Sequence, residues 1–168
     1  MAEPGRNAPG GVVVPGFAPA YLPRMTNRPP IDAVLAELVE EFDLLGDWEG
    51  RIEYVIDLGK GLAPLPEADR IDVNKVSGCA AQVWLAVRRG DGRLQFLADS
   101  DSALSKGNIA LLLKLYSDRT PEEILGFDAR AALDRLGLPS ALTRQRANGL
   151  NAMVGRIREA AALESAHP

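Results

Sequence analysis

Apolar residues with a helical period mark the first two predicted helices. In the first, six apolar positions recur at intervals of three and four residues, on one stripe of a helix: Ile31, Val34, Leu35, Leu38, Val39 and Phe42. Pro30 suits the first turn of this helix. A second helix is expected to follow Asp47 and to end near Gly59, because four apolar residues share one of its sides: Trp48, Ile52, Val55 and Ile56.

Alternating apolar and polar positions predict a β-hairpin in the middle of the chain. Residues 82–88 and 93–98 each place three apolar side chains on one face: Val83, Leu85 and Val87 in the first strand, and Leu94, Phe96 and Ala98 in the second. The tripeptide Gly90-Asp91-Gly92 between them is typical of a hairpin turn. Residues 59–72 are expected to form a loop, and residues 72–76 suggest a third strand.

Helical patterns return after the hairpin. Residues 103–116 become apolar almost all round in their second half, which predicts a central buried helix. Thr120 and Glu123 form a capping box around a proline, and Asp128 and Thr143 suit the N-caps of two further helices. The first of these should end before Gly137, and the last keeps a period of 3.6 residues: Leu150, Met153, Val154, Ile157 and Ala161. These elements predict an α+β domain, a small antiparallel sheet packed against several helices.

The first 30 residues differ from the rest of the chain. They are rich in Pro, Gly and Ala and show no apolar period, so we expect a flexible extension over residues 1–30 and a folded domain over residues 31–168. An edge strand over residues 12–14 is the alternative, although Pro15 would cut it short.

Composition narrows the class of protein. A chain of 168 residues that is 46% apolar suits one domain with a real core. The formal charge of −4 gives no reason to expect nucleic acid or anionic membrane as a partner. No apolar run approaches the roughly 20 residues of a membrane span. The first residues also lack a basic stretch leading into an apolar one, so we expect the protein in the cytoplasm.

Few residues can carry chemistry. The chain has one cysteine, Cys79, and one histidine, His167, at the penultimate position. These counts exclude an internal disulfide, a cysteine-rich or histidine-rich metal site and a Cys-His or Ser-His-Asp nucleophile. Glycine-rich phosphate and dinucleotide motifs are also absent from the sequence. We therefore expect neither a metal nor an organic cofactor in this chain.

Cys79 lies in a run of small residues, Ser77-Gly78-Cys79-Ala80-Ala81, which would let another protein's active-site loop approach. A thiol there could act as a nucleophile in its thiolate form. The alternative is a buried cysteine that acts as a small hydrophobe, the commonest fate of a lone cysteine. Asp99 and Asp101, near the end of the second hairpin strand, could be catalytic or could simply form a turn and a helix N-cap.

The segment around the cysteine resembles the signature of the SufE family of sulfur acceptors, which includes CsdE. The resemblance extends in collinear order over residues 39–160. Its motifs are Asn74-Lys75-Val76-Ser77-Gly78-Cys79-Ala80-Ala81-Gln82-Val83-Trp84-Leu85, Asp99-Ser100-Asp101, Leu115-Tyr116-Ser117, Thr120-Pro121-Glu122-Glu123-Ile124-Leu125 and Arg146-Ala147-Asn148-Gly149-Leu150.

The resemblance implies a sulfur carrier with a fold like that of the cluster scaffold IscU, although this chain lacks a scaffold's three cysteines. It would accept sulfur as a persulfide on Cys79 from a PLP-dependent cysteine desulfurase of the SufS or CsdA type, and stimulate that enzyme. An iron–sulfur scaffold would be the downstream acceptor. Asp101 matches an acidic position near the cysteine loop, and Arg146 matches an arginine at the start of the last helix.

Four residues depart from the family pattern. Ser77 stands where the family often has His or another polar side chain, Ala80-Ala81 replaces a more polar Gln-Ser pair, and Arg144 stands near where Pro is common. Lys75 and Arg146 therefore remain as cations that could stabilise a thiolate or persulfide, or could be solvated charges. Two other functions stay open. One is a single-cysteine thiol peroxidase, which would need a low-pKa thiol with hydrogen-bond donors around it. The other is a module that binds a desulfurase without using its thiol.

Overall fold

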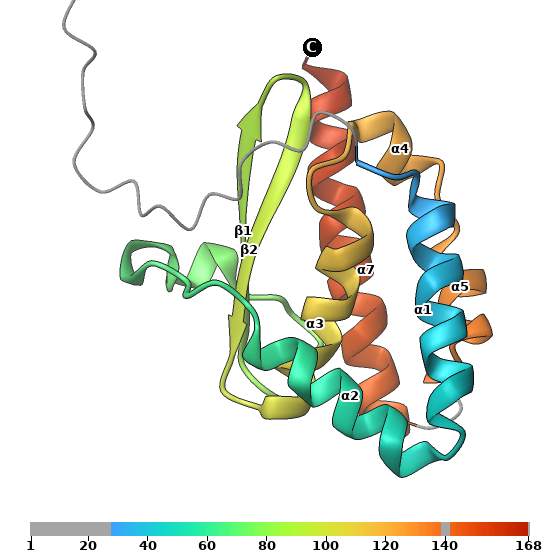
Figure 1. Cartoon of the computed structure of the whole chain (residues 1–168). Coiled ribbons are helices and arrows are strands. Elements are labelled where there is room, and N and C mark those ends of the chain that lie inside the picture. Colours follow the sequence, from blue (N-terminus) through green and yellow to red (C-terminus); the bar gives the residue numbers. More distant parts are fainter. Residues whose placement is uncertain (1–27, 139–141, 168) are drawn as a thin grey trace, which may run out of the picture.

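The computed structural model describes residues 28–138 and 142–167, and over this part of the chain the predicted α+β class is confirmed (Figure 1). The possible strand over residues 12–14 lies outside the described residues. At the end of the predicted extension, the Arg28 guanidinium donates hydrogen bonds to the carbonyl oxygens of Lys114 and Ser117. This contact ties Arg28 to the last turn of a helix in the folded domain.

The first two helices form where the apolar periods predict them. Helix α1 (Ile31–Leu45) buries the predicted stripe except for a half-buried Val39, and Pro30 is its N-cap. Helix α2 (Trp48–Lys60) starts at Asp47, whose carboxylate accepts a hydrogen bond from the backbone N–H of Gly50 at 2.7 Å. Such a cap satisfies a backbone donor that the helix itself leaves unpaired.

The predicted hairpin is confirmed and is longer than the alternation indicates. Strand β1 (Val83–Gly90) pairs antiparallel with β2 (Arg93–Ser100), with Val83 opposite Ser100 and Gly90 opposite Arg93. The two turn residues, Asp91 and Gly92, have φ values of 53° and 71°. Positive φ at both positions defines a type I′ turn, whose twist matches that of the paired strands.

The predicted third strand over residues 72–76 is wrong. A 3₁₀ turn, η2 (Asp72–Asn74), occupies most of it, after an earlier 3₁₀ turn, η1 (Glu67–Asp69). Pairing with the sheet is limited to one isolated bridge between Lys75 and Trp84. Val73, which an extended strand would bury on one face, is 68% exposed. The described part of the chain therefore has a two-stranded sheet.

Helix α3 (Ala103–Tyr116) is the central element, as predicted. It contacts α2, β2, α7 and α1, and all but one of the residues from Gly107 to Tyr116 are buried. Its crossing with α2 is close because two glycines meet there. A Cβ atom placed on Gly107 would lie 2.2 Å from the Val55 carbonyl oxygen, and one on Gly59 would lie 2.7 Å from the Gly107 nitrogen. Gly59 thus serves helix packing, and Gly61 is the C-cap of α2.

The remaining helices start at the predicted caps. The capping box of Thr120 and Glu123 is present at α4 (Pro121–Leu125). Asp128 caps α5 (Ala129–Arg135), and Thr143 caps α7 (Arg144–Ala166). Most of the predicted apolar stripe of α7 is buried, and Val154 is half-buried. In Figure 1 the hairpin and α1 lie on opposite sides of the view, with α3 and α7 between them.

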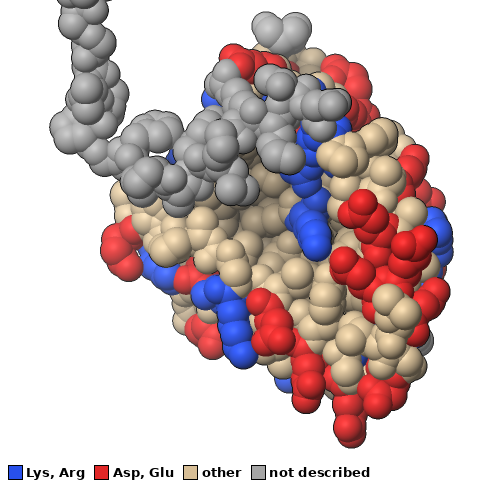
Figure 2. Space-filling view, viewed as in Figure 1, with Lys and Arg blue, Asp and Glu red and all other residues tan. Residues whose placement is uncertain are grey.

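Surface charge is unevenly distributed. Figure 2 shows acidic side chains gathered on the side of the molecule formed by α1. Exposed carboxylates of this helix include Asp32, Glu37, Glu40 and Asp43. This face would repel a phosphate backbone. Within the described residues, no helix combines the length and the apolar character needed to cross a membrane.

Candidate functional site

The loop that carries Cys79 is fixed at its base. The Val76 N–H donates a hydrogen bond to the carbonyl oxygen of Val83 at 2.9 Å, which closes the loop where it meets β1. At the C-terminal end of the loop, just before β1, the Gln82 N–H donates a hydrogen bond to a carboxylate oxygen of Asp101 at 3.0 Å. The Gln82 carbonyl oxygen accepts from the Ser100 hydroxyl at 2.7 Å. Both ends of the loop are therefore held, and the small residues form its tip.

The tip of the loop rests on helix α7. Gly78 has a φ of +93°, a backbone conformation that residues with a Cβ atom rarely adopt. A Cβ at Gly78 would lie 3.4 Å from that of Ala152. The Cys79 thiol donates a hydrogen bond to the carbonyl oxygen of Gly149 at 3.5 Å. A Cβ at Gly149 would lie 3.5 Å from Cys79 Sγ, an ordinary contact distance, so the cysteine packs directly against the helix at this residue.

Cys79 is half-buried, and its burial raises the pKa of the thiol above the ordinary value. Removal from water disfavours the charged thiolate, which is the form that attacks electrophiles. In the free protein this shift favours the protonated thiol over the thiolate.

A cavity of about 210 Å³ lies beside the thiol. It is formed by the cysteine loop, the start of α3 and the start of α7, and its lining residues are Cys79, Ala80, Ala81, Ser102, Ser105, Asn108, Gln145, Arg146, Gly149 and Met153. Its volume is several times the roughly 30 Å³ that a water molecule occupies in the liquid. The cavity can therefore receive an atom added to the cysteine sulfur.

Two of the three residues singled out from the sequence line this cavity. Cys79 and Arg146 do so, and the Arg146 side chain is exposed at the start of α7. Asp101 is not among the lining residues, and its carboxylate instead holds the end of the cysteine loop through Gln82. It is not a helix N-cap either, since Ser102 caps α3. Lys75 pairs with Asp72 at 3.3 Å and also lies outside the cavity lining.

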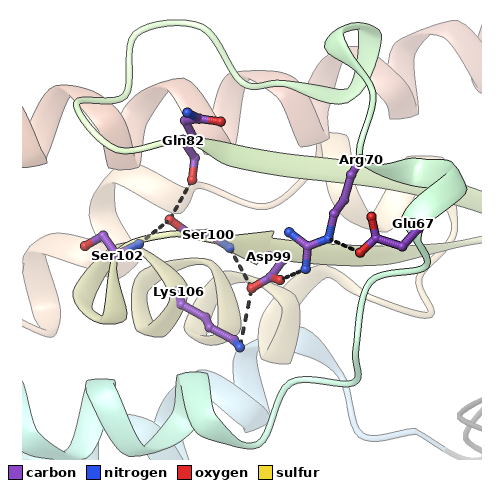
Figure 3. A network of polar contacts seen from close by, with 7 residues as sticks. All are labelled: Glu67, Arg70, Gln82, Asp99, Ser100, Ser102 and Lys106. Atoms are coloured by element: carbon purple, nitrogen blue, oxygen red, sulfur yellow. Dashed lines mark hydrogen bonds and ion pairs between the residues drawn. The ribbon is translucent and has the colours of Figure 1, made fainter.

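A polar network around Asp99 fixes the sheet edge next to the loop (Figure 3). The Asp99 carboxylate accepts from the Ser100 backbone N–H at 2.8 Å and pairs with Arg70 and with Lys106, the latter at 3.3 Å. Burial alone would raise the pKa of Asp99, but these three donors outweigh it and hold the pKa below the ordinary value. The network joins residues 67–70, the end of β2 and the start of α3.

Trp84, a signature residue without a role assigned from the sequence, lies beside this network. The Arg70 guanidinium is 5.2 Å from the centre of its ring, and the Lys75 ammonium is 6.0 Å from it. Both distances suit a cation–π contact. Trp84 therefore links the segment before the cysteine loop to the first strand, which is a structural role.

Several residues of the site were not identified from the sequence, and Gly149 and Asn108 are two of them. Gly149 belongs to one of the family motifs, and a glycine in the middle of a long helix is a signal of close approach. Asn108 was not identified, although it shares a helix face with Ser102 and Ser105 at intervals of three residues. Ser102, Ser105 and Asn108 all line the cavity. These polar residues continue into an otherwise apolar helix, and that pattern could have indicated a site from the sequence.

The raised thiol pKa predicts slow alkylation. At neutral pH, iodoacetamide should modify Cys79 of the folded protein several-fold more slowly than Cys79 of the protein in denaturant. The rate in the folded protein should keep rising at pH values where the denatured control has levelled off, because its thiolate forms at higher pH. Mass spectrometry over time gives both rates. Equal rates and equal pH profiles would show that the thiol is not shielded.

This chain is similar to a known protein family over most of its length. Residues 36–161 match the SufE family, described as an Fe-S metabolism associated domain. The matched segment includes the cysteine loop, the hairpin, α3 and most of α7.

Individual relatives agree with the family match. An uncharacterized SufE-like protein of Rhizobium etli is 43% identical over 138 residues, which cover 80% of this chain and 93% of the relative. Another, from Rhizobium meliloti, is 40% identical over 131 residues and covers 76% of this chain and 94% of the relative. The solution structure of a hypothetical protein from Thermus thermophilus has the same fold, with a TM-score of 0.66 and 18% identity. That match covers 79% of this chain and 96% of the other.

Proposed function

Because the chain belongs to the SufE family, and with it to iron–sulfur metabolism, we propose that it is a sulfur carrier. It takes up one sulfur atom as a persulfide on Cys79 and passes that sulfur on. The observation that carries the proposal is the setting of this thiol. Cys79 is at the tip of a loop held at both ends, and it faces a cavity large enough for an added sulfur atom.

The proposed reaction exchanges one sulfur–sulfur bond for another. The Cys79 thiolate attacks the outer sulfur of a persulfide on the donor protein. A bond forms between Cys79 Sγ and that outer sulfur, the donor's own sulfur–sulfur bond breaks, and the donor cysteine leaves as a thiolate. The thiol proton of Cys79 is released to solvent before the attack. No net oxidation occurs, so the rate depends on the thiolate fraction and on positioning.

The donor in this proposal is a PLP-dependent cysteine desulfurase of the SufS or CsdA type, which the protein also stimulates. The downstream acceptor is an iron–sulfur scaffold, and the exchange takes place in the cytoplasm. A raised thiol pKa in the free protein fits such a partnership. The desulfurase must favour a state of the loop in which the thiol is exposed, by binding that state more tightly. The resting thiol then avoids side reactions with oxidants and other electrophiles.

The site residues take different roles in this proposal. Cys79 is the acceptor, and the exposed Arg146 at the cavity offers a positive charge to the persulfide anion. Asp101 is a positioning residue, because its carboxylate holds the loop through the Gln82 N–H. A thiol peroxidase is less well supported, since that chemistry needs a thiol of lowered pKa and burial raises the pKa of this one.

Intact-mass spectrometry distinguishes these chemistries. After incubation with a cysteine desulfurase and free cysteine, the protein should gain the mass of one sulfur atom, and a reducing agent should remove it. After brief incubation with peroxide at equal concentration, most of the protein should keep its original mass. Rapid oxygen addition together with no sulfur addition would overturn the carrier proposal in favour of the peroxidase.

A further inference from the structure

Asn108 is the buried polar residue of the cavity next to Cys79. It lines the cavity, and only 3% of its surface is exposed. The other polar residues of the lining are at least partly exposed, and Gln145 and Arg146 are exposed. Asn108 is therefore the buried polar side chain among the lining residues.

The side-chain oxygen of Asn108 is not satisfied by the protein. No described residue provides a hydrogen bond to this oxygen, which is itself buried. Leaving a buried polar atom without a partner costs about 1–3 kcal/mol, so such groups are rare in folded proteins. Its neighbours on α3 from Ile109 to Leu113 are all apolar and buried. An apolar side chain would therefore suit this position better for stability alone.

We propose that Asn108 binds the outer sulfur of the Cys79 persulfide. This inference rests on the proposed function and adds a ligand for the sulfur that the protein carries. The outer sulfur would lie about 2 Å beyond Sγ, in the cavity that both residues line. There the Asn108 side-chain N–H₂ group donates a hydrogen bond to the sulfur anion.

The chemistry of both groups suits this contact. The contact uses the Asn108 N–H₂ group, since an amide nitrogen donates hydrogen bonds and an amide oxygen only accepts them. A persulfide anion removed from water needs hydrogen-bond donors. The thiol before loading needs none, because it is itself the donor in its contact with the Gly149 carbonyl oxygen. Arg146 adds charge from the exposed side, and Asn108 is the buried donor.

The test loads the persulfide without a desulfurase, so that it does not depend on the proposed partner. Cys79 is first converted to a mixed disulfide with thiopyridine. Hydrosulfide then attacks the cysteine sulfur, forms the persulfide and releases thiopyridone. The rate at which glutathione removes the outer sulfur is followed by intact mass in the wild type and in Asn108→Leu. Asn151→Leu, the same change at an exposed position of α7, is the matched control.

Asn108→Leu should lose the outer sulfur about tenfold faster than the wild type, because a hydrogen bond to a charged group is lost. Asn151→Leu should behave like the wild type. The melting temperature of Asn108→Leu should be unchanged or higher, since the variant removes an unsatisfied buried amide. Equal rates for all three proteins would overturn the inference and leave the carrier proposal standing. Failure of the desulfurase to load the wild type would instead contradict the carrier proposal.

A second measurement uses the wild-type protein alone. The side-chain amide resonances of Asn108 in a ¹⁵N NMR spectrum should shift when Cys79 becomes a persulfide. They should shift much less when Cys79 becomes a neutral methyl disulfide of similar size. Shifts of the same size for both adducts, or for neither, would contradict a hydrogen bond to the sulfur anion.

Discussion

Cys79→Ser is expected to abolish sulfur uptake completely while leaving the fold intact. A serine hydroxyl cannot form a persulfide, and the chain has no second cysteine to replace it. The substitution is nearly isosteric, and the hydroxyl can still donate to the Gly149 carbonyl oxygen that the thiol contacts. The melting temperature should therefore change little. Sulfur bound to the protein after incubation with desulfurase and cysteine, and the rate of desulfurase turnover, are the quantities to measure.

A relocated thiol provides the control for this experiment. The double variant Cys79→Ser, Ser77→Cys moves the thiol two residues along the same loop, to an exposed position outside the cavity lining. This variant should retain little of the transferred sulfur, because small thiols can attack an exposed persulfide and remove its outer sulfur. Full desulfurase stimulation by Cys79→Ser would favour a binding module that does not use its thiol.

Gly107→Ala should be the most destabilising small substitution near the site. The added Cβ would lie 2.2 Å from the carbonyl oxygen of Val55 and 2.7 Å from its carbon, so backbone rather than a flexible side chain must move. Overpacking of this kind costs about 3 kcal/mol. The gain in helix propensity from glycine to alanine offsets about 1 kcal/mol at most. A net loss of about 2 kcal/mol is large against a total stability of roughly 5–15 kcal/mol.

Thermal and denaturant unfolding of Gly107→Ala check this expectation. The melting temperature should fall by roughly 4–8 °C for a chain of this size. Gly155→Ala is the matched control, because Gly155 is in α7 and a Cβ there would meet no atom within 4 Å. That variant should be neutral or slightly stabilised. Equal melting temperatures for the two variants would show that α2 and α3 can separate at no cost.

The effect of Gly107→Ala should extend to the site, since the next residue is Asn108. Moving α3 away from α2 displaces the helix that brings Ser105 and Asn108 to the cavity. Alkylation of Cys79 should then become faster at temperatures where the variant is still folded.

The helices and the hairpin could be predicted because the residues that specify each of them are neighbours in the sequence. The apolar stripe of α1, the capping box at Thr120 and the turn at Asp91 and Gly92 depend on neighbouring residues alone. The third strand was predicted wrongly from equally local evidence. Val73 is typical of a strand, yet it is 68% exposed within a 3₁₀ turn.

The site could be predicted only in part, because it combines segments far apart in the chain. Cys79 and Arg146 were identified through a family resemblance, and both line the cavity. The contact of the cysteine loop with Gly149 and the approach of Gly107 to Val55 depend on how distant segments pack against each other, which no local pattern specifies. The missing partner of the Asn108 oxygen is likewise a property of the folded molecule.

The central claim is that Cys79 carries sulfur, and following the sulfur atom itself tests it most directly. A desulfurase is supplied with cysteine that contains a heavy sulfur isotope, the mixture is alkylated and digested, and the peptide containing Cys79 is analysed by tandem mass spectrometry. We predict one heavy sulfur atom on Cys79, between Sγ and the alkyl group. The contrary result is heavy sulfur found only as free sulfide, with the alkyl group attached directly to Cys79 Sγ, although the protein and the desulfurase do form a complex. That result would contradict the claim that Cys79 carries sulfur.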